Sequence, residues 1–75
     1  MAALPSTQPW RVVITTADGT LIETNHRTSQ GAYNRVVAER EAIADGRSSS
    51  TAIRVERWNA EYDQWALYEQ AYLRR

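Results

Sequence analysis

The sequence predicts a small α+β domain of ββαββ order, a four-stranded antiparallel sheet with one helix packed on one face. Three observations support this. Two β-prone runs near the start flank a turn-forming Ala-Asp-Gly, a single helical stretch follows, and two further β-prone runs flank a polar stretch near the end. Because 75 residues supply only one small hydrophobic core, all of these elements must share it.

The composition of the chain already makes some classes of function less favourable than others. Nine arginines balance nine acidic residues and give a formal net charge of zero, which removes the bulk attraction typical of nonspecific nucleic-acid or membrane binders. The chain has no cysteine, so neither a disulfide nor a thiolate metal site supplements the small core, and a homodimer is an expected source of extra stability. With no secretory pattern and no membrane-spanning run, we expect a cytoplasmic protein without membrane contact.

Residues 1–9 contain two prolines and small polar residues, and we expect them to form a flexible N-terminal tail. The single α+β domain is then expected over residues 10–73. It begins with WRVVITT, which pairs with TLIETN as a hairpin. A three-residue loop over residues 17–19, with Gly19 in the left-handed conformation, sets Ile14 opposite Ile22.

The stretch SQGAYNRVVAEREAIAD, residues 29–45, has helical spacing of its apolar residues. Thr28 or Ser29 is expected as the N-cap, and Gly46 suits the left-handed residue that ends a helix. Glu39, Glu41 and Asp45 are expected on the solvated side of this helix.

The last third of the chain is predicted to form a second hairpin. Pairing Asn59 with Gln64 leaves a loop over residues 60–63, and the register then makes three chemically sensible cross-strand matches. These matches are Trp58 with Trp65, Val55 with Tyr68, and Arg54 with Glu69. The alternative is a helix over residues 60–73, with Asn59 as N-cap and arginines in its last turn.

One helix shields one face of such a sheet, so alternation along the strands assigns each side chain to the helix side or to an open side. The helix side is expected to hold Trp10, Val12, Ile14, Ile22, Ile53, Val55, Ala66 and Tyr68. The open side is expected to hold Arg11, Val13, Leu21, Glu23, Arg54, Glu56, Trp58, Trp65 and Leu67. The second set is too apolar for an ordinary wet face, and this indicates an interaction surface.

The sequence therefore predicts a non-enzymatic protein-interaction module that binds a protein partner or itself. Interface energy concentrates in Trp, Tyr and Arg side chains, which selects five candidate partner-binding residues on the open side. These are Trp58, Trp65, Leu67, Arg54 and Arg11. A cross-strand Trp pair also stabilises a hairpin without any partner, so the rings have a purely structural alternative.

Nucleic-acid binding is the alternative function, with Arg11, Arg54 and Arg57 contacting phosphates and the tryptophans stacking on bases. Three acidic residues, Glu23, Glu56 and Glu69, are expected among those arginines. They favour cross-strand ion pairs over phosphate contacts.

Signals for catalysis are weak. His26 is the only histidine, which makes no metal cluster, although with the start of the helix it offers an anion site. Ser48 to Ser50 lack an activating base and are interpreted as part of a linking loop. No carboxylate pair is placed in an apolar pocket. We therefore expect no catalytic residue, no metal site and no cofactor.

Overall fold

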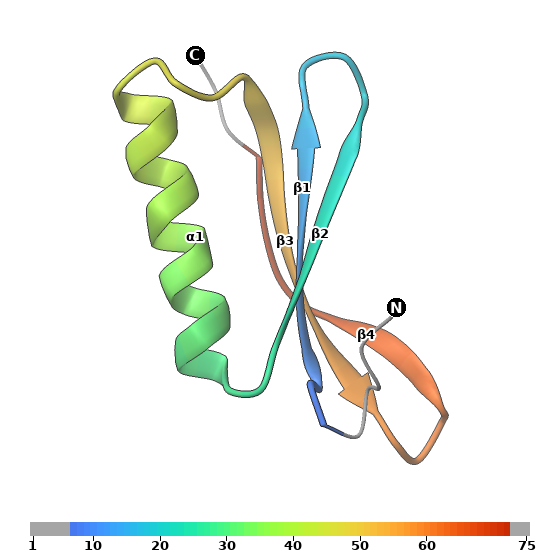
Figure 1. The fold of residues 1–75 in the computed structure, drawn as a ribbon. Helices are drawn as coiled ribbons and strands as arrows, with labels where there is room; N and C mark the ends of the chain where they lie inside the picture. The colour runs from blue at the N-terminus through green and yellow to red at the C-terminus, as the bar shows by residue number, and fades with distance from the viewer. Residues whose placement is uncertain (1–6, 73–75) are drawn as a thin grey trace.

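The computed structural model describes residues 7–72 and contains four strands and one helix in the predicted order (Figure 1). The elements are β1 (Trp10–Thr16), β2 (Leu21–His26), α1 (Ser29–Ala44), β3 (Ser50–Asn59) and β4 (Gln64–Tyr72). The strands form one open antiparallel sheet in the order β2-β1-β3-β4, which confirms the predicted small α+β domain. Regular structure starts at Trp10 as expected, whereas residues 1–6 of the expected tail, and residue 73, lie outside the described residues.

The first hairpin has the predicted register, with Ile14 opposite Ile22. Gly19 adopts a φ of 87°, and the backbone N–H of Thr16 donates to the carbonyl of Thr20 over 2.9 Å, so residues 17–19 form the three-residue loop. Asp18 accepts hydrogen bonds from the hydroxyl of Thr16 and the backbone N–H of Thr20, and these bonds lower the pKa of its carboxyl to about 2. Local turn chemistry therefore accounts for this hairpin.

Helix α1 begins and ends as its sequence predicts. The hydroxyl of Thr28 accepts a hydrogen bond from the N–H of Gly31 over 3.0 Å, so Thr28 is the N-cap. Gly46 has a φ of 74°, and the N–H of Arg47 donates to the carbonyl of Ala42 over 2.8 Å. Gly46 in the left-handed conformation lets the chain turn back, and the hydrogen bond from Arg47 to Ala42 spans one residue more than a helical one. This arrangement satisfies the last carbonyls of the helix.

The segment after Asn59 is a hairpin, and the alternative of a helix over residues 60–73 is wrong. Trp58 lies opposite Trp65 and Asn59 opposite Gln64, as predicted. The side-chain oxygen of Asn59 accepts hydrogen bonds from the N–H groups of Glu61 and Tyr62, at 3.0 and 3.3 Å. Asn59 thus satisfies the amides of a tight turn by the same chemistry that suggested a helix cap.

A β-bulge changes the register of the second hairpin beyond the tryptophans. Glu56 lies opposite Leu67, but Val55 lies opposite Glu69, so Tyr68 is an extra residue on β4. The predicted pairs of Val55 with Tyr68 and of Arg54 with Glu69 are therefore wrong, and Gln70 is the partner of Arg54. Opposite residues share a face of the sheet, so the bulge moves Glu69 to the helix side.

The core lies between α1 and the central strands. Its buried side chains are Val12, Ile14, Ala32, Ile53 and Val55, and Trp10 and Val36 pack against them. Helix α1 packs on β1, β2 and β3, while β4 lies beyond its reach (Figure 1). One face of the sheet is therefore covered in part by α1, and the opposite face is covered by no helix or strand of residues 7–72.

Candidate functional site

The five residues predicted to bind a partner share the uncovered face of the sheet. The strand ladder places Arg11 of β1 opposite Glu56 of β3, and Glu56 opposite Leu67 of β4. Trp58 and Trp65 form the next pair on this face, toward the β3–β4 turn. Arg54 lies on the other side of Glu56 along β3. We call Arg11, Arg54, Trp58, Trp65 and Leu67 the open-face cluster.

Aromatic and cationic groups pack closely in this cluster. The rings of Trp58 and Trp65 are 5.4 Å apart between centroids and 73° apart in orientation, an edge-to-face arrangement. The guanidinium of Arg11 lies over the ring of Trp65, 4.3 Å from its centroid. Leu67 beside them is 53% exposed. The cluster is thus held in one arrangement while part of its apolar surface faces solvent.

A buried carboxylate supports the cluster from below. Glu56 is only 5% exposed, although no helix within residues 7–72 covers this face. Its Oε1 accepts a hydrogen bond of 2.6 Å from Nε of Arg11. Its Oε2 forms an ion pair with Nε of Arg54 at 3.0 Å. Arg11 also lies 3.8 Å from Glu23. The cross-strand ion pairing expected for Glu23 and Glu56 is therefore present.

Two charged residues expected near this face lie on the other one. Arg57 is opposite Trp10 in the ladder, and its guanidinium lies 5.4 Å from the centroid of the Trp10 ring. Glu69 is on the same side because of the bulge. The three arginines considered for phosphate binding therefore do not share one surface.

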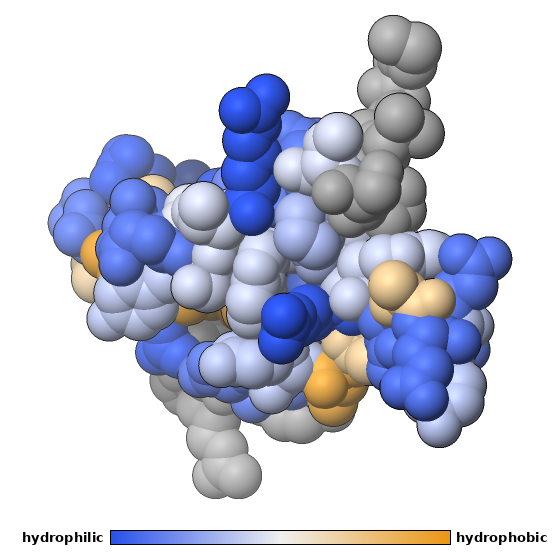
Figure 2. All heavy atoms as spheres, turned by 90° about the horizontal axis from the view of Figure 1, so that it is seen from below, coloured by the Kyte–Doolittle hydropathy of each residue, from blue (hydrophilic) through white to orange (hydrophobic). Residues whose placement is uncertain are grey.

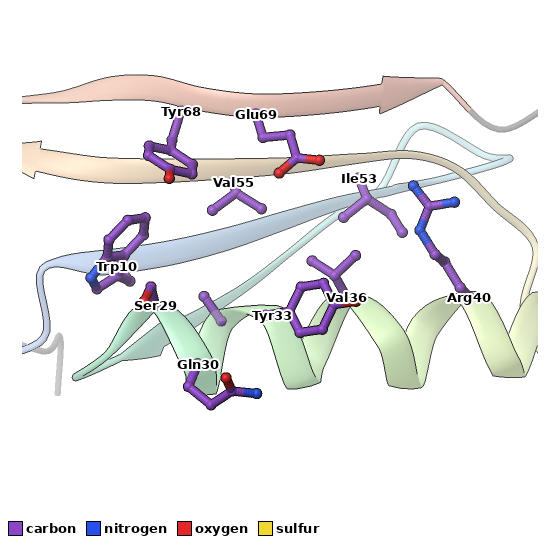
Figure 3. Close-up of a pocket in the computed structure, with 11 residues that line it drawn as sticks. Trp10, Ser29, Gln30, Tyr33, Val36, Arg40, Ile53, Val55, Tyr68 and Glu69 are labelled. Atoms are coloured by element: carbon purple, nitrogen blue, oxygen red, sulfur yellow. The ribbon is translucent and has the colours of Figure 1, made fainter.

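Sequence reasoning missed a groove on the helix side, between α1 and β4 (Figure 3). It has a volume of about 530 Å³. Trp10 and Tyr68 meet edge to face at one end, with ring centroids 4.9 Å apart. The lining residues are Trp10, Ser29, Gln30, Ala32, Tyr33, Val36, Arg40, Ile53, Val55, Tyr68 and Glu69. No sequence signal revealed this groove, because it depends on the bulge and on where α1 lies across the sheet.

The serine stretch and Glu39 have a structural role that the sequence did not predict. Glu39 is 7% exposed and its carboxylate accepts hydrogen bonds from the hydroxyls of Ser48 and Ser50 and from Arg35. Burial alone would raise the pKa of Glu39, but these bonds together hold it below its ordinary value. The solvated position expected for Glu39 is wrong, and the serines attach the return loop to the helix.

His26 lies at the end of β2, where its Nε2 shares a hydrogen bond of 2.9 Å with the hydroxyl of Thr24. Partial burial and the nearby charge of Arg35 lower the pKa of the imidazole. Within residues 7–72, no three His, Asp or Glu side chains gather in a way that could hold a metal ion. The surroundings of His26 thus consist of Thr24 on its own strand and the charge of Arg35 on α1.

The surface around the turn of the β3–β4 hairpin and the start of α1 is mostly polar, with small separate apolar patches (Figure 2).

Fold and surface together define a small α+β domain with two unpaired surfaces, the open-face cluster and the groove. Comparison with protein-family models, with curated proteins and with solved structures found no match. In the described part of the chain, α1 is too short and too polar to cross a bilayer.

Proposed function

We propose that this chain is a small, non-enzymatic protein-interaction module that binds a protein partner, or a second copy of itself, through the open-face cluster. The observation that carries the proposal is the packed Trp58 and Trp65 pair beside the half-exposed Leu67, on a face that no helix or strand of the described residues covers. Large aromatic side chains supply most of the energy in many protein interfaces. We assign no catalytic residue and no cofactor to the module.

Preorganisation of the cluster supports this function. Arg11 stacks on Trp65 and is itself fixed by the buried carboxylate of Glu56. Side chains that are already ordered lose little conformational entropy when a partner binds, so more of the contact energy contributes to affinity. A cytoplasmic location is part of the proposal, and the absence of cysteine from the sequence is compatible with it.

The charge arrangement favours a protein over a nucleic acid as partner. Arg11 and Arg54 both pair with Glu56, and Arg57 lies on the opposite face. Phosphate contacts would have to compete with these ion pairs. Binding to RNA or DNA that weakens steeply with salt would instead favour the nucleic-acid function.

The proposal is tested with a Trp58→Ala, Trp65→Ala double variant, compared with the natural chain by sedimentation velocity and by pull-down. If the natural chain dimerises through this face, we expect the variant to be monomeric. If it is a monomer, we expect the variant to lose the partner that the natural chain recovers. A folded variant that keeps both its oligomeric state and every partner overturns the proposal.

A second substitution separates binding from folding, because loss of two tryptophans also weakens the hairpin. Leu67→Glu places a charge on the cluster at a side chain that is 53% exposed and leaves the ring pair intact. Ile22→Glu is its control, since Ile22 is 42% exposed and lies opposite Ile14 on the helix side. We expect Leu67→Glu to reduce binding at least tenfold and Ile22→Glu to leave it unchanged.

A further inference from the structure

Two residues of opposite charge line the groove, Arg40 of α1 and Glu69 of β4. The bulge at Tyr68 brings Glu69 to the helix side of the sheet and so places both charges on one surface. Figure 3 shows both side chains extending into the space between α1 and β4. Neither forms an ion pair with the other or with any residue in the range 7–72. The groove therefore holds a cation and an anion that are both available to a ligand.

Aromatic rings with exposed surface line the same groove. Tyr33 of α1 and Tyr68 of β4 are each 62% exposed. The ring of Tyr68 packs edge to face against that of Trp10, with centroids 4.9 Å apart, and this contact orders one end of the groove. The aliphatic residues of the lining that come from β3, Ile53 and Val55, are already buried. The apolar contact open to a ligand is therefore aromatic.

The volume of the groove is that of a site for a small molecule. It is about 530 Å³, and ligand pockets typically measure about 300–1,000 Å³. Such pockets combine apolar and aromatic lining with a few polar groups that orient the ligand. Because the charged groups here have opposite signs, they select a ligand that carries both charges itself.

We propose that the groove binds a zwitterionic amino acid with an aromatic side chain. The carboxylate of the ligand accepts hydrogen bonds from the guanidinium of Arg40, whose planar donors match a carboxylate. Its ammonium group donates to the carboxylate of Glu69, and its ring packs on Tyr33 and Tyr68. The groove lies on the opposite side of the sheet from the open-face cluster, so this site is independent of the function proposed above.

A zwitterion suits this groove better than a ligand with one charge. An anionic ligand would pair with Arg40 but would also meet the carboxylate of Glu69, and a cationic ligand would meet the reverse combination. Like charges brought together weaken binding. A free amino acid carries both groups on one carbon atom, whereas within a peptide chain both groups are amides. The free molecule is therefore the expected ligand.

The test is an NMR titration of the full chain with L-phenylalanine and three analogues. Phenylalanine amide lacks the carboxylate, N-acetylphenylalanine lacks the ammonium group, and glycine lacks the ring. We expect L-phenylalanine to bind saturably with a Kd of about 1 mM. The amide and the N-acetyl analogue should each bind roughly threefold or more weakly, and glycine should not bind saturably. The backbone amide signals of Tyr33, Tyr68 and Glu69 should shift, and those of Trp58 and Trp65 should not.

Substitutions assign each ligand charge to its partner. In Arg40→Gln the preference for L-phenylalanine over its amide should disappear, because the carboxylate has lost its partner. In Glu69→Gln the preference over N-acetylphenylalanine should disappear for the matching reason. Arg27→Gln and Glu41→Gln alter exposed side chains that do not line the groove, and both should leave the two preferences unchanged. Circular dichroism verifies that each variant is folded.

The comparison of ligands on the natural chain needs no substitution, so a variant that fails to fold leaves it intact. The proposal is overturned if L-phenylalanine does not bind saturably, or if the amide or the N-acetyl analogue binds as tightly. It is also overturned if the signals that shift belong to the open face, or if folded Arg40 and Glu69 variants keep both preferences.

Discussion

Arg11 of β1 and the buried Glu56 of β3 form a partly buried ion pair that links the two central strands on the uncovered face, with 2.6 Å between Nε and Oε1. Arg11 also stacks on Trp65, so this pair connects the centre of the sheet to the aromatic pair at the β3–β4 turn. Removing a buried carboxylate leaves its cationic partners without compensation.

Glu56→Gln is expected to lower the free energy of unfolding by about 1–3 kcal/mol, because Arg11 and Arg54 both lose their anionic partner. Urea denaturation followed by tryptophan fluorescence measures the change. Glu23→Gln is the control, since Glu23 is half exposed and lies 3.8 Å from Arg11, and it should cost less than about 0.5 kcal/mol. Equal effects of the two substitutions would contradict the importance of the partly buried pair.

Trp58 and Trp65 are expected to be energetically coupled. A double-mutant cycle with alanine at each position should give an interaction free energy of about 0.5–1.5 kcal/mol. Either single substitution already removes the edge-to-face contact, so the double variant loses nothing further from it. A cycle between Trp58 and Trp10, which lie on opposite faces, is the comparison and should be nearly additive. Additive effects at Trp58 and Trp65 would show that the contact does not stabilise the hairpin.

Glu39 is expected to make stability depend on pH in the acidic range. Its folded pKa is lower than the ordinary value of 4.5, so its stabilising effect is complete above that value and is lost as pH falls through the folded pKa. The difference in free energy of unfolding between the natural chain and Glu39→Gln should therefore be largest near neutral pH and shrink below pH 4.5. Denaturant titrations over this range measure it, and a difference that grows as the pH falls would be the wrong sign.

Two glycines should respond to alanine in opposite directions. Gly46 has a φ of 74°, where a Cβ atom is strained, so Gly46→Ala should lower the free energy of unfolding by about 1 kcal/mol. Gly31 lies inside α1, and a Cβ there would meet its nearest neighbour, Oγ1 of Thr28, at an ordinary 3.4 Å. Gly31→Ala should therefore raise the free energy of unfolding by about 0.5 kcal/mol. Thermal denaturation of both variants checks the signs.

Features that depend on neighbouring residues were predictable. Gly19 and Gly46 each impose a local backbone geometry, and together with the capping hydroxyl of Thr28 this was enough to predict the first hairpin and the two ends of the helix. The second turn was predicted from the cross-strand match of Trp58 with Trp65. The alternation of side chains then placed Trp58, Trp65 and Leu67 correctly on the open face, because they lie between the β3–β4 turn and the bulge, where the register is still set by the loop. Arg11 and Arg54 were placed correctly because the pairing of β1 with β3 is uninterrupted there.

Features that depend on distant contacts required the folded molecule. The extra residue at Tyr68 shifts the alternation of side chains along β4. Glu69 therefore lies on the helix side of the sheet, opposite Val55, and not opposite Arg54 on the open side. Glu39 is buried because the return loop brings Ser48 and Ser50 back against it. Alternation in a strand predicts faces only while the pairing is uninterrupted, and neither a bulge nor the position of a helix across a sheet is encoded by any short stretch of residues.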